Sequence, residues 1–127
     1  MHAASPKLRT LVSELLAALC VLSLSDGHKL VLAALSDYRV SYAEGFRFEE
    51  LVRYLKIDGD AEEMSGNERD DQGVWDARAA TMALINALTN SPESLEDRIM
   101  LREEFSRRGL NEAVVVRAVQ PLNLYLR

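Results

Sequence analysis

The stretch MALINALTNSPESLEDRIMLREEFSRRGL, residues 82–110, contains two helical patterns separated by a short break. The first is apolar on almost every side and stops at Ser91–Pro92, where serine suits an N-cap and proline suits the first helical position. The second has acidic residues in its first turns and arginines in its last, which complements the helix dipole, and Gly109 fits the position after a helix end. We therefore expect two consecutive helices, over residues 74–90 and 91–109.

The rest of the chain carries the same kind of signal. Apolar residues recur at helical spacing after Ser5–Pro6, again an N-cap residue followed by proline. Strand signals are nearly absent. We expect an all-α chain, with further helices from Pro6 to the break at 25–27, over 26–45, over 46–56, and from Asn111 to Pro121.

Two of these helices are apolar nearly all round. Every residue from Leu15 to Leu22 is apolar, and ATMALINAL, residues 80–88, has a similar character. A helix without a polar face must be covered by neighbouring helices, as happens in stacked helical repeats. Because two or three repeats are marginal alone, we expect both ends to be cut surfaces that pack against further repeats.

Residues 58–73 interrupt the helical pattern. Seven carboxylates and one arginine lie between Asp58 and Asp71, and no apolar periodicity is present. Such a composition buries too little apolar surface to offset the entropy lost on ordering. We expect a disordered acidic insertion there, inside one domain that spans residues 7–120.

Composition narrows the class of protein. The 127 residues are 48% hydrophobic and 28% charged, with a formal net charge of −5, which indicates one globular domain. An acidic chain without a basic face favours a basic protein partner over nucleic acid. No apolar run reaches the ~18 residues of a membrane span, and a single cysteine excludes an internal disulfide. We expect a cytoplasmic protein.

Residues that carry chemistry are sparse. His2, His28 and Cys20 have no zinc-binding spacing, so we expect Cys20 in the core and His28 on the surface. Carboxylate pairs such as Glu49–Glu50 and Glu103–Glu104 are expected to be solvated surface charges. The sequence predicts no enzyme, no metal site and no cofactor.

Asn86 stands out, because it lies in the apolar helix and an unpaired buried amide costs about 1–3 kcal/mol. Two explanations are open. Its side chain could bond a backbone carbonyl at a neighbouring helix end, or it could line a groove that meets a ligand. Small residues favour a groove that accepts an apolar helix. They are Ala83 and Ala87 beside Asn86, and Ala17 and Ala18 on the first helix.

Longer motifs resemble a known family. They are TLVSELLAALCVLSLSDGHKLVLAAL, RFEELVRYL and the stretch at 82–110, and they occur in the order found in the diaphanous-inhibitory, or formin homology 3, region of formins. The resemblance covers roughly residues 7–116, and its wording looks closest to fungal formins. It implies an armadillo-like partial superhelix of stacked helical repeats.

The resemblance also implies a regulatory role. In formins the concave face of this region binds an amphipathic helix from the C-terminal autoregulatory segment, and a Rho-type small GTPase releases it. Ala18, Val21 and Asn86 match family positions that contact this helix. Leu15, one turn before Ala18, is expected on the same face, and Ala83 is expected to complete the groove.

Parts of the family pattern are absent from this chain. Few residues precede the first helix, so we expect GTPase binding to belong to the full-length protein. Actin is expected to be contacted only through a C-terminal domain that this sequence lacks, in a cytoskeleton-associated protein. The alternative is a helical scaffold fragment that oligomerises without a groove ligand.

Overall fold

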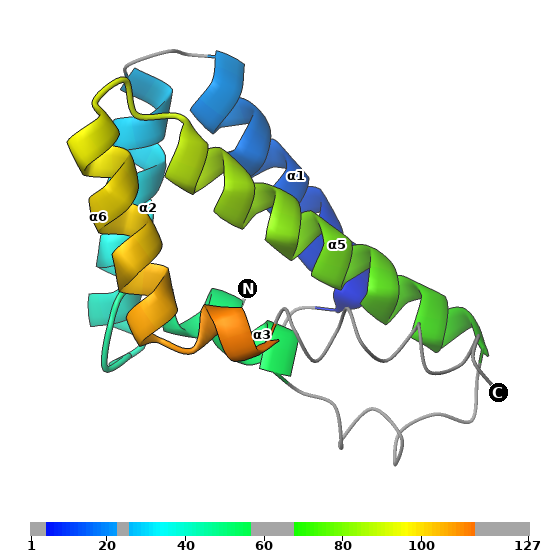
Figure 1. The fold of residues 1–127 in the computed structure, drawn as a ribbon. Helices are drawn as coiled ribbons and strands as arrows, with labels where there is room; N and C mark the ends of the chain where they lie inside the picture. The colour runs from blue at the N-terminus through cyan, green and yellow to red at the C-terminus, as the bar shows by residue number, and fades with distance from the viewer. Residues whose placement is uncertain (1–4, 23–25, 57–67, 114–127) are drawn as a thin grey trace, which may run out of the picture.

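The computed structural model describes residues 5–22, 26–56 and 68–113, and all regular structure within them is helical, as predicted. The helices are α1 (Pro6–Leu22), α2 (Asp26–Ser41), α3 (Glu49–Lys56), α5 (Glu68–Asn90) and α6 (Leu95–Arg107). A further helical turn begins at residue 110, and the rest of the helix predicted from Asn111 to Pro121 lies outside the described residues. Figure 1 shows α1 and α5 lying along one another, with α2 and α6 toward one end of the pair.

The pair of α1 and α5 forms the centre of the fold. The two helices run parallel, because Pro6 lies beside Gly73 at one end and Val21 lies in the same hollow as Asn90 at the other. α1 makes most of its tertiary contacts with α5. Parallel packing of helices that are distant in sequence is typical of successive helical repeats.

Capping residues set where the helices begin and end. The backbone N–H of Leu8 donates to Ser5 Oγ at 3.3 Å, which confirms Ser5 as the first N-cap. The last long helix begins later than predicted, because Ser94 rather than Ser91 is its N-cap and accepts from the Asp97 N–H. At the end of this helix Gly109 has a φ of +89°, a backbone conformation that glycine adopts without strain.

Three other predicted boundaries differ from the structure. α5 begins at Glu68, so residues 68–73 are helical and do not belong to an unstructured insertion. The remainder of that predicted insertion lies outside the described residues. The predicted second helix ends early, at Ser41, because Ala43 adopts a positive φ, and the predicted third helix begins at Glu49 instead of residue 46, because Phe48 adopts a positive φ.

A single apolar core joins the helices. Phe105 of α6 and Phe48 stack with their ring centroids 4.4 Å apart, and both side chains are buried. α5 supplies the centre of this core through Leu84, Ile85 and Leu88, which are almost completely buried. Replacing a leucine at such a position by alanine typically costs about 2–5 kcal/mol.

Within the described residues α1 is covered on only one side, contrary to the expectation of burial all round. Arg9, Ser13 and Cys20 face the interior, and the burial predicted for Cys20 is confirmed. The opposite side carries four leucines that are between 49% and 81% exposed, and we call this set the α1 leucine stripe. Its members are Leu8, Leu11, Leu15 and Leu22.

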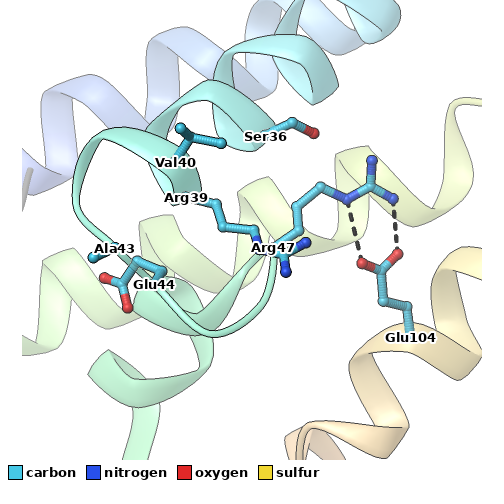
Figure 2. Close-up of a pocket in the computed structure, with 7 residues that line it drawn as sticks. All are labelled: Ser36, Arg39, Val40, Ala43, Glu44, Arg47 and Glu104. Atoms are coloured by element: carbon cyan, nitrogen blue, oxygen red, sulfur yellow. Dashed lines mark hydrogen bonds and ion pairs between the residues drawn. The ribbon is translucent and has the colours of Figure 1, made fainter.

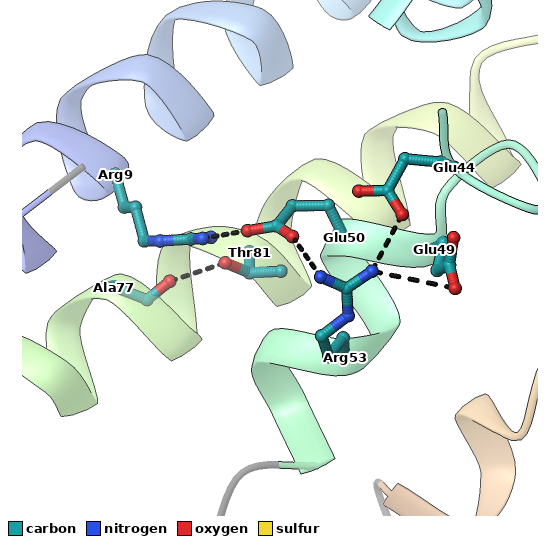
Figure 3. A network of polar contacts seen from close by, with 7 residues as sticks. All are labelled: Arg9, Glu44, Glu49, Glu50, Arg53, Ala77 and Thr81. Carbon is teal, nitrogen blue, oxygen red and sulfur yellow. Dashed lines mark hydrogen bonds and ion pairs between the residues drawn. The ribbon is translucent and has the colours of Figure 1, made fainter. Parts of the chain in front are cut away.

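A buried ion pair ties α1 to α3. The Arg9 guanidinium binds the Glu50 carboxylate and lies 4.1 Å from the Tyr54 ring centroid. Glu50 also accepts from Arg53, which in turn pairs with Glu44, as Figure 3 shows. The prediction that Glu50 is a solvated surface charge is wrong, because the ion pair allows its carboxylate to be buried.

His28 is also buried rather than exposed, contrary to the prediction. Its Nε2 lies 2.8 Å from the Leu88 carbonyl oxygen. A carbonyl only accepts hydrogen bonds, so Nε2 donates and the hydrogen bond satisfies a free carbonyl at the end of α5. The start of α2 is thereby fixed to the end of α5.

Candidate functional site: a groove between α1 and α5

A hollow of about 600 Å³ opens between α1 and α5 near their C-terminal ends. Four of the five predicted site residues line it together, namely Ala18, Val21, Ala83 and Asn86. Leu15 does not line it and belongs to the α1 leucine stripe. The other residues of this hollow, which we call the α1–α5 groove, are Ala17, Cys20, Ala87, Asn90 and Ser91.

Small side chains create the groove. The alanines of α1 and α5 end at Cβ, so two parallel helices that touch through these residues leave space between their outer edges. The larger residues of α5, such as Leu84 and Leu88, are fully buried in the core and do not fill this space. Helical periodicity therefore separates a large-residue core face from a small-residue groove face on the same helix.

Asn86 lies at the exposed edge of this groove, so the prediction that it is buried is wrong. Within the described residues the Asn86 side chain makes no hydrogen bond. The alternative that it bonds a backbone carbonyl at a neighbouring helix end therefore has no contact to support it. The carboxamide instead faces solvent beside an apolar floor. It offers both donors and an acceptor to anything that enters the groove.

Asn90, one turn later, has a partner. Its Oδ1 accepts from Nη2 of Arg102 on α6 at 2.6 Å. The two asparagines lie on the same side of α5, because residues four apart share a helix face. The groove thus has an apolar floor and a polar edge, and none of its lining residues is acidic.

A second hollow, of about 540 Å³, lies between the end of α2 and α6 and is shown in Figure 2. Arg47 and Glu104 cross it with two hydrogen bonds, Nε to Oε1 at 3.2 Å and Nη2 to Oε2 at 2.8 Å. This bidentate geometry satisfies both charges internally. The hollow therefore offers less to a ligand than the α1–α5 groove does.

Titrating groups with shifted pKa values gather around the turn between α2 and α3. A hydrogen bond that protonated Glu44 donates to the Glu49 carboxylate, together with burial, raises the pKa of Glu44, and accepting this bond lowers the pKa of Glu49. Burial, assisted by Glu50 and Glu44, raises the pKa of Tyr38 to about 12. Arg53 bonds Glu44 at 2.7 Å, so these carboxyl groups belong to an ion-pair network that holds α3 in place.

Metal and membrane features are not found in the described part of the chain. No group of three or more His, Cys, Asp or Glu side chains there could hold a metal ion. None of the helices in the described ranges is long and apolar enough to span a membrane.

Sequence comparison identifies the family of this chain. The Diaphanous FH3 domain model matches residues 28–116, which is most of the chain. This chain belongs to the formin family. The FH3 domain is armadillo-like and non-catalytic, so the predicted armadillo-like fold and the expectation of a non-enzyme are both confirmed.

Individual relatives agree with the family. Formin-D and Formin-F of Dictyostelium discoideum are 37% and 32% identical to this chain over 108 residues, and human Formin-like protein 3 is 32% identical over 108 residues. These matches cover 85% of this chain and only 8–9% of each relative. The expected nearness to fungal formins is not supported, because these relatives come from an amoeba and a vertebrate. No solved structure matches the chain.

Proposed function

We propose that this FH3 domain is the regulatory binding module of a Rho-controlled formin. Its α1–α5 groove binds the amphipathic helix of the formin C-terminal autoregulatory segment, and this binding regulates actin filament assembly. The main observation in support is that Ala18, Val21, Ala83 and Asn86 line one hollow.

The lining of the groove suits an apolar helix. A helix with leucine anchors every three to four residues can bury them on an alanine floor, and each fully buried leucine contributes about 1.5–3 kcal/mol. The Asn86 carboxamide can bond a polar group of the bound helix and so fix its register. Leu15 is proposed to extend the contact along α1, one turn before Ala18.

The remaining partners follow from the family and concern the whole protein. A Rho-type small GTPase acts on the full-length formin, and actin is contacted through the C-terminal assembly domain. The chain covers only 8–9% of the formins it resembles, so both partners are assigned to the longer protein. We also propose a cytoplasmic, cytoskeleton-associated location.

The groove is tested by placing a charge on its floor. Ala18→Asp puts a carboxylate where an apolar anchor must pack, which costs several kcal/mol and weakens binding about 100-fold. Ala34→Asp makes the same change on the exposed side of α2, outside the groove, and is the matched control. Fluorescence anisotropy with a labelled formin C-terminal peptide measures both. Equal binding by wild type and Ala18→Asp rules out the groove.

A scaffold function is the second candidate, and the α1 leucine stripe favours it. An apolar row of this kind on a helix surface commonly marks an interface between proteins. Under this hypothesis the chain oligomerises and binds no groove ligand. Light scattering over a range of concentrations, together with the peptide assay, separates the two: growth in mass without peptide binding favours the scaffold.

A further inference from the structure

The polar edge of the α1–α5 groove ends in a cation. Arg102 reaches from α6 to Asn90, and its Nη2 donates to Asn90 Oδ1 at 2.6 Å. Because the amide oxygen is occupied by this bond, the free amide hydrogens of Asn90 are on the opposite side of the carboxamide. The groove edge at this point therefore consists of donors, from Asn90 and from the remaining N–H groups of Arg102.

No acidic side chain of the described structure neutralises Arg102. The ion pairs among the described residues are formed by Arg9, Arg47 and Arg53. The positions three and four residues away on α6, where a partner would lie, are Arg98, Ile99, Phe105 and Ser106. Arg102 is exposed and its charge is available.

We propose that Arg102, held against Asn90, is a specificity-determining residue that binds an acidic side chain of the groove ligand. This inference rests on the proposed function, because it concerns the helix bound in the same groove. A carboxylate is the group that fits, since it accepts from a guanidinium in a charge-assisted, bidentate manner. The bound helix accordingly has apolar anchors over the alanine floor and an Asp or Glu near the end of α5.

The test uses the full 127-residue chain and a labelled peptide from the C-terminal region of human Formin-like protein 3, where the proposed function expects the autoregulatory segment. A peptide series replaces each Asp or Glu, one at a time, by its amide. Binding of every peptide is measured by anisotropy to wild type, Arg102→Gln and Arg107→Gln. Arg107→Gln is the matched control, because it makes the same change of charge on the same helix, whereas only Arg102 is hydrogen-bonded to the groove residue Asn90.

Arg102→Gln is expected to weaken the parent peptide about fivefold to thirtyfold, and Arg107→Gln less than twofold. One amide peptide should show the same loss with wild type and no further loss with Arg102→Gln, which identifies the contacting acid. Arg102→Lys, which keeps the charge, should recover part of the affinity.

Other results overturn the inference in distinguishable ways. Equal losses for Arg102→Gln and Arg107→Gln, or equal sensitivity of all amide peptides to Arg102→Gln, show that only net charge matters; the groove function then stands without Arg102. If wild type binds no peptide of the series, the proposed function fails and this inference fails with it. Circular dichroism of each variant establishes that it is folded.

Discussion

The buried ion pair between Arg9 and Glu50 predicts an asymmetric loss of stability when either partner is removed. Both side chains are only 8% exposed, so neither charge has water to replace its partner. Removing one member of such a pair typically costs about 3–5 kcal/mol. The change is made with apolar residues of similar size, Arg9→Met and Glu50→Leu.

The two substitutions differ in which charge remains buried and in whether that charge keeps a partner. Without Arg9, Glu50 retains Arg53 at 3.2 Å, so we expect a loss of about 1–3 kcal/mol. Without Glu50, the described contacts of Arg9 reduce to the Tyr54 ring, and the loss should reach about 3–5 kcal/mol. The double variant buries no charge at this site, because Arg53 keeps Glu44, and it should be more stable than Glu50→Leu alone.

Urea unfolding of the full chain, followed by circular dichroism at 222 nm, measures these differences in the free energy of unfolding. If Glu50→Leu is too unstable to give a folded baseline, all variants are compared in a stabilising osmolyte. Arg47→Met is the control, since its ion pair with Glu104 is more exposed and should contribute about 1 kcal/mol or less. Equal losses for Glu50→Leu and Arg9→Met would refute this account of the pair.

Three further outcomes are expected. Cys20 is 1% exposed and burial raises the pKa of its thiol. A thiol reagent should therefore modify Cys20 at least tenfold faster in urea, where the chain is unfolded, than in buffer, and equal rates would contradict its burial. Gly109 has a φ of +89°, which strains any residue with a Cβ, so Gly109→Ala should lower the free energy of unfolding by about 1–2 kcal/mol. Gly45→Ala, measured in the same urea assay, meets only ordinary contacts and should cost less than about 1 kcal/mol. The pKa of Tyr38 is raised to about 12, so the unfolded chain loses the Tyr38 proton at lower pH than the folded chain and stability should fall between pH 10 and 12. In a pH series, the melting temperature of Tyr38→Phe should fall less over this range than that of the wild type.

Local patterns in the sequence predicted the features that depend on near neighbours. Ser5 caps α1 because its hydroxyl meets an N–H three residues away, and Cys20 is buried because it lies on the helix face toward α5. The groove was also foreseeable, since alanines at helical spacing on two helices are too small to fill the space between the outer edges of those helices. The positions of these alanines, Ala17 and Ala18 on one helix and Ala83 and Ala87 on the other, indicated which two helices form it.

Features that depend on distant partners were missed. His28 can be buried because it hydrogen-bonds a backbone carbonyl 60 residues away in the sequence. Glu50 can be buried because it pairs with an arginine 41 residues away. Judged by charge and polarity alone, both residues belong on the surface, because neither has its bonding partner nearby in the sequence. Leu15 illustrates the opposite case: hydrophobicity predicted its burial, but no described helix covers that side of α1.

The pairing of α1 with α5 also determines the order in which the chain can fold. In repeat proteins each unit packs on the next one along the sequence, so a unit is completed only when its neighbour has been made. Here the interior face of α1, with Arg9 and Cys20, is completed by helices that end at Lys56 and Asn90. A growing chain leaves α1 without its main partner until residues 68–90 have been made. We therefore expect one cooperative transition, slower than that of a simple helical hairpin, in which the first helix is among the last to become protected from hydrogen exchange.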